Sequence, residues 1–160
     1  MRQETEQLII NFLASDDLDD LHRMDTDLSV RRYINGKASS LDETKKYLSE
    51  NIISYRAHGY GRYAIRDRFT NEFLGICGFL CENYGVDFGY RFLPSSWGKG
   101  IATEAALAVL KKGIPNHLRE QVVGIVLPEN KASKTVLTKV GFKWKENVEL
   151  LGFNVEKYTL

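Results

Sequence analysis

A glycine turn between a strand and a helix is the most informative stretch of the sequence. Residues 90–105 read YRFLPSSWGKGIATEA. The residues up to Phe92 are typical of a strand that Pro94 ends, and the small residues from Gly100 onward are typical of a helix. Helix N-termini carry free N–H groups that bind anions, and glycines let a phosphate approach the backbone. The pattern therefore favours a phosphate site, to which Lys99 adds a positive charge.

Two familiar phosphate-binding loops do not fit this turn. A Walker A loop has Ser or Thr after its Gly-Lys pair, whereas Gly98 and Lys99 are followed by Gly100. A GxGxxG loop would need its third glycine where Thr103 stands. On the local pattern alone, a glycine-rich turn without any ligand is equally compatible with the sequence.

The remaining patterns predict an α/β (α+β) sheet rather than a strictly alternating doubly wound fold. Strand patterns are found at residues 8–12, 62–67, 72–81, 86–92, 122–127, 142–150 and 153–160. Helix patterns are found at about residues 18–24, 41–58, 100–112 and 130–140. Ser40 and Glu43 form a capping box before the second helix, and Gly59 ends it. Gly89 within a strand indicates a bulge or a close backbone approach.

Composition bounds the function before any motif is considered. The 160 residues include 22 basic and 21 acidic ones, and the formal net charge is +1. Together with 43% hydrophobic and 27% charged residues, this predicts one ordinary globular domain over residues 1–160. A nearly neutral chain excludes bulk attraction to polyanions as the main function, so we expect no nucleic-acid partner.

Targeting and redox signals point to the cytoplasm. The charged N-terminus is not a signal peptide, and the longest near-apolar run, 73–81, is half of a membrane span, so we expect no membrane partner. Cys77 and Cys81 lie about 13 Å apart on one predicted buried strand and cannot form a disulfide. The histidines are scattered at positions 22, 58 and 117, so no metal site is expected.

Three motifs together resemble the GCN5-related N-acetyltransferases (GNAT), in the branch of the ribosomal-protein N-acetyltransferases. They are WGKGIATEA at 97–105, NKAS at 130–133 and KVGF at 139–142, and the similarity covers nearly the whole chain. The resemblance implies a mixed, mostly antiparallel seven-stranded sheet flanked by about four helices. It also implies splayed central strands that form a slot for acetyl-CoA, and an N-acetyltransferase that needs no metal.

The resemblance also implies where acetyl-CoA binds. The pyrophosphate would lie on backbone N–H groups of residues 98–103, and the backbone of Phe92 and Leu93 would pair with the pantetheine amides. Trp97 stands where the family has Gln or Arg, so one side-chain contact of the family is absent. The expected cofactor contacts are Phe92, Leu93, Trp97, Gly98, Lys99, Gly100, Ile101, Ala102, Thr103, Asn130 and Ser133.

Acetyl transfer to an amine requires the amine to be neutral. Deprotonating a lysine-type amine at pH 7 costs roughly 4–5 kcal/mol, and an α-amine costs about 1.4 kcal/mol. Asp87, on the strand beside the slot, is the first candidate base, although a structural ion pair with Arg91 fits the pattern equally well. Glu149 is a second candidate, for which a solvated surface position is the more expected role.

The leaving thiolate also needs a partner. Many GNAT proteins have a tyrosine acid where this chain has Leu137, whereas the ribosomal-protein branch uses the serine that corresponds to Ser133. A serine hydroxyl is a poor acid, so we expect Ser133 to donate a hydrogen bond rather than a full proton. Tyr158 is either an alternative acid or a sheet residue.

The acceptor would occupy a cleft between residues 25–39 and the final hairpin, lined by Arg31, Arg32 and Tyr33. Both cysteines are expected in a buried strand, so direct attack in a ternary complex is favoured over a covalent acetyl-enzyme. The acceptor could be a protein N-terminus or a small-molecule amine, and the protein a monomer or a homodimer. The alternative function is a catalytically weak acyl-CoA sensor or interaction domain.

Overall fold

A computed structural model describes residues 1–160, and an eight-stranded sheet runs through it in the order β1-β2-β3-β4-β5-β6-β8-β7. The strands are β1 (Arg2–Glu4), β2 (Leu8–Phe12), β3 (Arg62–Asp67), β4 (Phe73–Glu82), β5 (Gly85–Phe92), β6 (Val122–Val126), β7 (Lys143–Leu150) and β8 (Phe153–Thr159). The α-helices are α1 (Leu18–Asp25), α2 (Leu28–Arg31), α3 (Leu41–His58), α4 (Ile101–Lys112) and α5 (Lys131–Lys139). None of the helices is both long and apolar enough to span a membrane.

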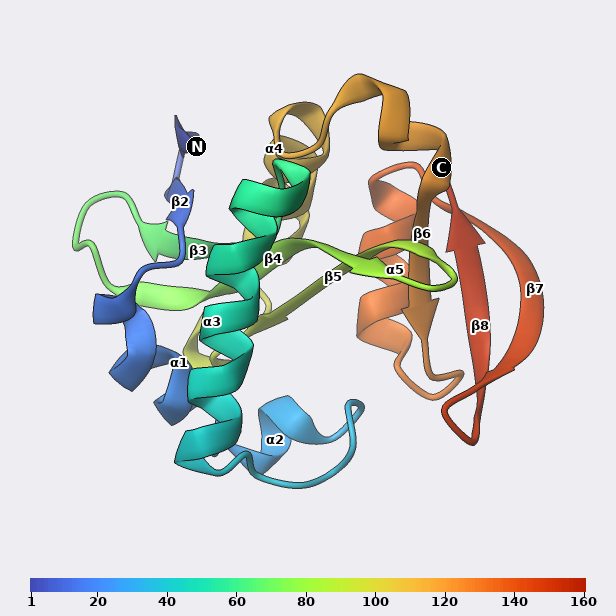
Figure 1. Cartoon of the computed structure of the whole chain (residues 1–160), viewed down its shortest axis with the longest axis horizontal. Coiled ribbons are helices and arrows are strands. Elements are labelled where there is room, and N and C mark those ends of the chain that lie inside the picture. The colour runs from blue at the N-terminus through green and yellow to red at the C-terminus, as the bar shows by residue number, and fades with distance from the viewer.

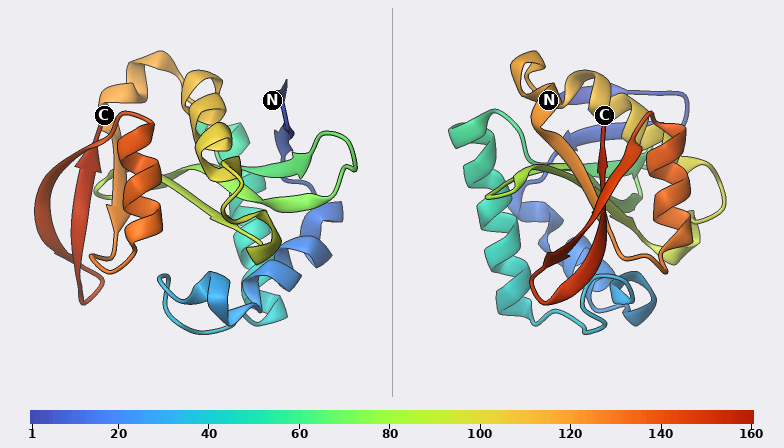
Figure 2. Two further views of the ribbon diagram at one scale, coloured as in Figure 1. Left: turned by 180° about the vertical axis from the view of Figure 1, so that it is seen from behind. Right: turned by 90° about the vertical axis from the view of Figure 1, so that its right-hand side faces the viewer.

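The helices cover both faces of the sheet (Figures 1 and 2). Neighbouring strand residues point to opposite faces, so Ala64 and Ile76 pack in a core with α1 and α3. Ile65 and Cys77 pack in the larger core on the other face, where α4 lies. The middle of β3, from Tyr63 to Ile65, is therefore apolar because it is covered on both sides.

The two central strands β5 and β6 separate along their length. They are the only parallel pair, and they are in register at two positions, Val86 with Val122 and Asp87 with Val123. Beyond these positions β5 continues to Phe92 without a partner on that side, and the ribbons diverge in Figure 1. The predicted splay is confirmed, and it opens a slot in the middle of the sheet.

Local signals define the ends of the longest helix as predicted. The Ser40 hydroxyl accepts a hydrogen bond from the Glu43 N–H at 3.1 Å, and the Glu43 carboxylate accepts one from the Ser40 N–H at 2.7 Å. Gly59 follows α3 with a φ of +79°, which L side chains rarely adopt.

Three expectations were wrong in detail. The sheet has eight strands rather than seven, because β1 pairs with β2 although its own residues have no strand pattern. Of the two alternatives for Gly89, the bulge is wrong, because β4 and β5 stay in continuous register from Gly75 to Glu82; a close approach is present, made by the Arg62 side chain. Cys81 is exposed, because β4 extends past the last pair it makes with β3 at Gly78.

Arg91 forms a buried ion pair, although not with Asp87. Its Nε and Nη2 donate to the two carboxylate oxygens of Asp25 at 2.7 and 2.9 Å, and its guanidinium lies 4.6 Å from the centre of the Tyr47 ring. Asp25 is 1% exposed. The expected Asp87–Arg91 pair does not form because the partner of Arg91 comes from α1, far away in the sequence. The pair joins α1 to the slot strand β5.

We predict that Asp25→Ala lowers the free energy of unfolding by about 3–5 kcal/mol, because it leaves a buried guanidinium unpaired. Urea unfolding checks this. Glu50→Ala is the control, since it removes the exposed Lys46–Glu50 pair, and we expect it to cost less than about 1 kcal/mol. Similar losses in both variants would contradict a structural role for the Asp25–Arg91 pair.

Candidate active site

The turn before α4 has the geometry of an anion site. Gly98 and Gly100 have φ angles of +71° and +75°, and a Cβ at either position would meet no atom within 4 Å. Backbone conformation rather than crowding therefore requires glycine here. Gly100 is the N-cap of α4. Because glycine has no side chain, the N–H groups in the first turn of α4 receive no hydrogen bond from a capping side chain. Lys99 and Trp97 are exposed beside them.

Trp97 has a structural role in place of the polar side chain that the family has at this position. Its indole N–H donates to the Phe92 carbonyl at 3.0 Å. The Leu93 N–H, just after β5, donates to the Leu74 carbonyl of β4 at 2.8 Å, so it is not free to pair with pantetheine as expected. Because alternate residues of an antiparallel strand bond to the same neighbour, the N–H groups of Tyr90 and Phe92 point away from β4, toward the slot.

Two adjacent cavities with lining residues in common extend from the turn into the slot. The smaller has a volume of about 250 Å³ and is lined by Trp97 and Ala102 at the turn. The larger has a volume of about 500 Å³ and reaches Asp87 and the β7–β8 turn. The residues that line both cavities are Tyr33, Ile34, Tyr90, Arg91, Asn130 and Ser133. The junction of the two cavities is therefore the point where a ligand from the turn would meet a second ligand.

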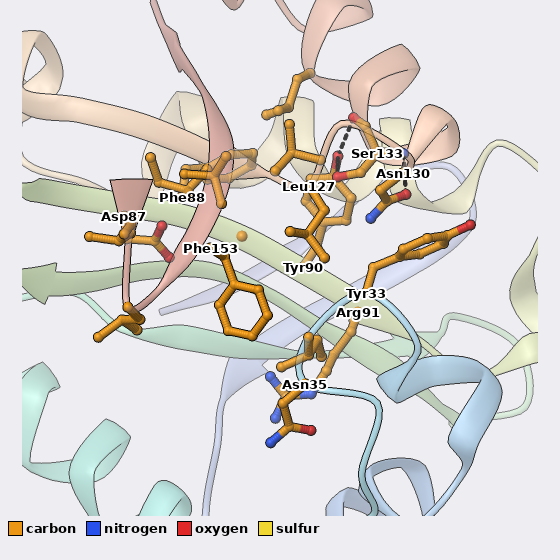
Figure 3. A pocket seen from close by; sticks show the side chains of 18 of the residues that line it. Tyr33, Asn35, Asp87, Phe88, Tyr90, Arg91, Leu127, Asn130, Ser133 and Phe153 are labelled. Atoms are coloured by element: carbon orange, nitrogen blue, oxygen red, sulfur yellow. Dashed lines mark hydrogen bonds between the residues drawn. The ribbon is translucent and has the colours of Figure 1, made fainter. Parts of the chain in front are cut away.

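Ser133 lies at this junction and is held by two neighbours (Figure 3). Its N–H donates to the Asn130 side-chain oxygen at 3.1 Å, so Asn130 caps α5 as predicted. The Tyr90 hydroxyl donates to the Ser133 carbonyl at 2.8 Å, and its oxygen lies 3.0 Å from the Ser133 hydroxyl. Burial raises the pKa of Tyr90, so the phenol stays protonated at neutral pH and remains a donor.

Asp87 lies in the larger cavity, and both of its carboxylate oxygens have partners. Oδ2 lies 2.5 Å from Arg62 Nη2, and Oδ1 accepts from the Tyr84 hydroxyl at 3.2 Å. Asp87 and Tyr90 are three residues apart on β5, so their side chains leave opposite faces and their Cα atoms lie about 10 Å apart. A carboxylate in this position reaches a group beside Ser133 only through water.

Of the residues expected to bind the acceptor, only Tyr33 lines the two cavities. Tyr33 lines both cavities, whereas Arg32 lies over the Tyr33 ring, 5.1 Å from its centre, and lines neither. Arg31 is buried and donates to the Lys37 carbonyl at 3.0 Å, which holds the loop after α2. Glu149 is exposed on β7 and lines neither cavity.

Sequence reasoning assigned no role to Tyr90 and Arg62. Tyr90 belongs to the deciding stretch, but only its contact with Ser133, 43 residues later, shows what its hydroxyl does. Arg62 reads as an ordinary strand residue, and nothing in the local sequence indicates that it binds Asp87. Tyr158 is outside both cavities, and its hydroxyl donates to Glu156 at 3.2 Å. No group of three or more His, Cys, Asp or Glu side chains could hold a metal ion.

Comparison with known proteins agrees with this geometry. The family model of the acetyltransferase (GNAT) domain matches residues 7–143. The chain belongs to the GNAT family. It is 26% identical over 149 residues to the uncharacterized N-acetyltransferase YoaA of Bacillus subtilis, covering 91% of this chain and 84% of that one. The GNAT domain and such relatives support N-acetyltransferase activity.

Solved GNAT structures share the fold. The RimL ribosomal L7/L12 α-N-protein acetyltransferase in complex with coenzyme A matches with a TM-score of 0.76 and 21% identity, over 96% of this chain and 93% of that one. Spermidine N-acetyltransferase from Vibrio cholerae, in complex with CoA and spermine, matches with a TM-score of 0.79 and 19% identity, over 96% and 95%. These two GNAT proteins act on different amines.

We predict that Gly100→Asp weakens CoA binding at least tenfold, because it places a negative charge at the helix N-terminus where a phosphate would lie. Isothermal titration calorimetry with CoA checks this. Gly59→Asp is the matched control, since Gly59 has a φ of +79° but ends α3, and its affinity should stay within twofold. Equal affinities in both variants would show that the phosphates bind elsewhere.

Proposed function

We propose that residues 1–160 form one N-acetyltransferase domain that transfers the acetyl group of acetyl-CoA to a primary amine by direct attack in a ternary complex. The observation that carries the proposal is the position of Ser133, held by Tyr90 and Asn130 where the two cavities meet. The CoA-bound relatives of the same fold support acetyl-CoA as the donor. The acceptor is a protein N-terminus or a small-molecule amine, the two kinds of acceptor named for those relatives.

The residues present fit acetyl-CoA. The N–H groups of residues 98–103 would hold its pyrophosphate, with Lys99 beside them, and no side chain crowds Gly98 or Gly100. The smaller cavity runs from Trp97 and Ala102 to Ser133 and would hold the pantetheine arm, to which the N–H of Phe92 points. When bound, acetyl-CoA supplies an activated acetyl group on a thiolate leaving group.

Ser133 would act on the leaving group and Asp87 on the attacking amine. The Ser133 hydroxyl would donate a hydrogen bond to the leaving sulfur, and Tyr90 would hold Ser133 in place through its hydrogen bond to the Ser133 carbonyl. A proton from the attacking amine would pass through water to Asp87, whose Oδ1 is bonded only to a neutral phenol. We assign no catalytic role to Glu149 or Tyr158, which lie outside both cavities.

Calorimetry with acetyl-CoA, together with thiol release over a panel of amines and peptide N-termini, tests the proposed function. We expect binding and turnover of at least one amine. Binding without turnover on any amine or peptide would make the protein an acyl-CoA sensor. The absence of binding would overturn both functions.

We predict that Ser133→Ala lowers kcat at least tenfold and leaves KM for acetyl-CoA within threefold, because a hydrogen bond to a charged group contributes about 1.5–3 kcal/mol. Tyr90→Phe should also lower kcat, but it should add nothing in the Ser133→Ala background, since it acts through Ser133. Steady-state thiol release measures all three variants. Tyr158→Phe is the control and should leave kcat unchanged.

A rise in KM with unchanged kcat in Ser133→Ala would assign Ser133 to binding instead. Additive losses of Tyr90→Phe and Ser133→Ala would contradict the positioning role of Tyr90.

A further inference from the structure

The larger cavity lies between three segments that are far apart in the sequence. The slot strands β5 and β6 form its base, and the loop after α2 and the β7–β8 turn lie at one end of the molecule beside it (Figures 1 and 3). Its volume of about 500 Å³ is within the range of small-molecule sites, about 300–1,000 Å³. Its apolar wall residues include Ile34, Phe88, Ile125, Leu127, Leu151 and Phe153.

The charged groups of this cavity are already paired. Its charged lining residues are Arg62, Asp87 and Arg91. Arg62 is bonded to Asp87 at 2.5 Å, and Arg91 is bonded to Asp25 at 2.7 and 2.9 Å. The wall thus carries one carboxylate, which the proposed function uses for the reacting amine, and no second one.

These pairings limit what a bound acceptor can carry. A second ammonium group in the cavity would lose its water without gaining a carboxylate partner. A carboxylate on the acceptor would meet guanidinium groups that are already bonded to Asp87 and Asp25. An apolar body would instead bury its surface against Phe153 and the aliphatic wall.

We propose that the acceptor is a small molecule that carries one amino group on an apolar, uncharged body. This inference rests on the proposed acetyl transfer and selects among its acceptors. Polyamines, charged amino acids and peptides should be poorer substrates, because each brings additional charged or polar groups into this cavity.

Hexylamine and 1,6-diaminohexane form a matched pair of probes, because they have the same chain length and differ by one amino group. We expect kcat/KM for hexylamine to exceed that for diaminohexane and spermidine at least tenfold. Calorimetric titration of each amine into CoA-saturated protein should show the same order of affinity without depending on turnover. A serine-initiated tripeptide tests the peptide class and should also be at least tenfold poorer.

Two substitutions test whether this cavity causes the preference for an acceptor with one amino group. Phe153→Ala should raise KM for hexylamine at least fivefold and leave CoA affinity unchanged, whereas Phe69→Ala, on the exposed β3–β4 turn, should change neither. Leu151→Glu adds a carboxylate at a side chain that is 89% exposed, so folding should tolerate it. It should reduce the discrimination against diaminohexane at least threefold, and Leu107→Glu on the outer face of α4 should not.

The possible outcomes separate the two claims. CoA binding together with a preference for diaminohexane, spermidine or the peptide would overturn the inference and leave the proposed function standing. Equal kcat/KM for hexylamine and diaminohexane would overturn it as well. The absence of CoA binding would overturn both.

Discussion

The separation of β5 from β6 is the constraint on which the site depends. Two registered pairs, at Val86 and Asp87, hold the strands together at one end, and beyond them neither strand completes the hydrogen bonds of the other. An open strand edge in the middle of a sheet requires partners for its backbone groups. A ligand with amide groups of its own can supply these hydrogen-bond partners. The break in the sheet therefore provides the backbone edge to which we propose that acetyl-CoA binds.

Arg62 stabilises the sheet next to this break. Its guanidinium donates to the Asp87 and Gly89 carbonyls at 3.0 and 3.3 Å as well as to the Asp87 carboxylate. A Cβ at Gly89 would lie 2.8 Å from Arg62 Nη2, so glycine leaves the room that the guanidinium occupies. The buried Arg91–Asp25 pair holds the other end of β5 against α1. The strand that borders the slot is thus held by these two arginines, and its Tyr90 contacts Ser133.

Features encoded within a few residues could be predicted from the sequence, and features made by distant contacts could not. The Ser40 capping box, the cap at Asn130 and the glycine turn at Gly98 and Gly100 are local, and the structure has them. Strand β1 and the Asp25–Arg91 pair depend on partners elsewhere in the chain. For the same reason the motif made Ser133 a candidate, whereas Tyr90, which contacts it, had no local signal. Arg31, expected to line the acceptor cleft, is buried and lines neither cavity.

The central claim is that the slot between β5 and β6 holds acetyl-CoA, with its sulfur at Ser133. A crystal structure of the protein with CoA tests it most directly. We expect the pyrophosphate on the N–H groups of residues 98–103, the pantetheine beside the backbone of Tyr90 and Phe92, and the sulfur within hydrogen-bond reach of the Ser133 hydroxyl. A CoA molecule bound outside the slot, or one whose sulfur lies away from Ser133, would contradict the account.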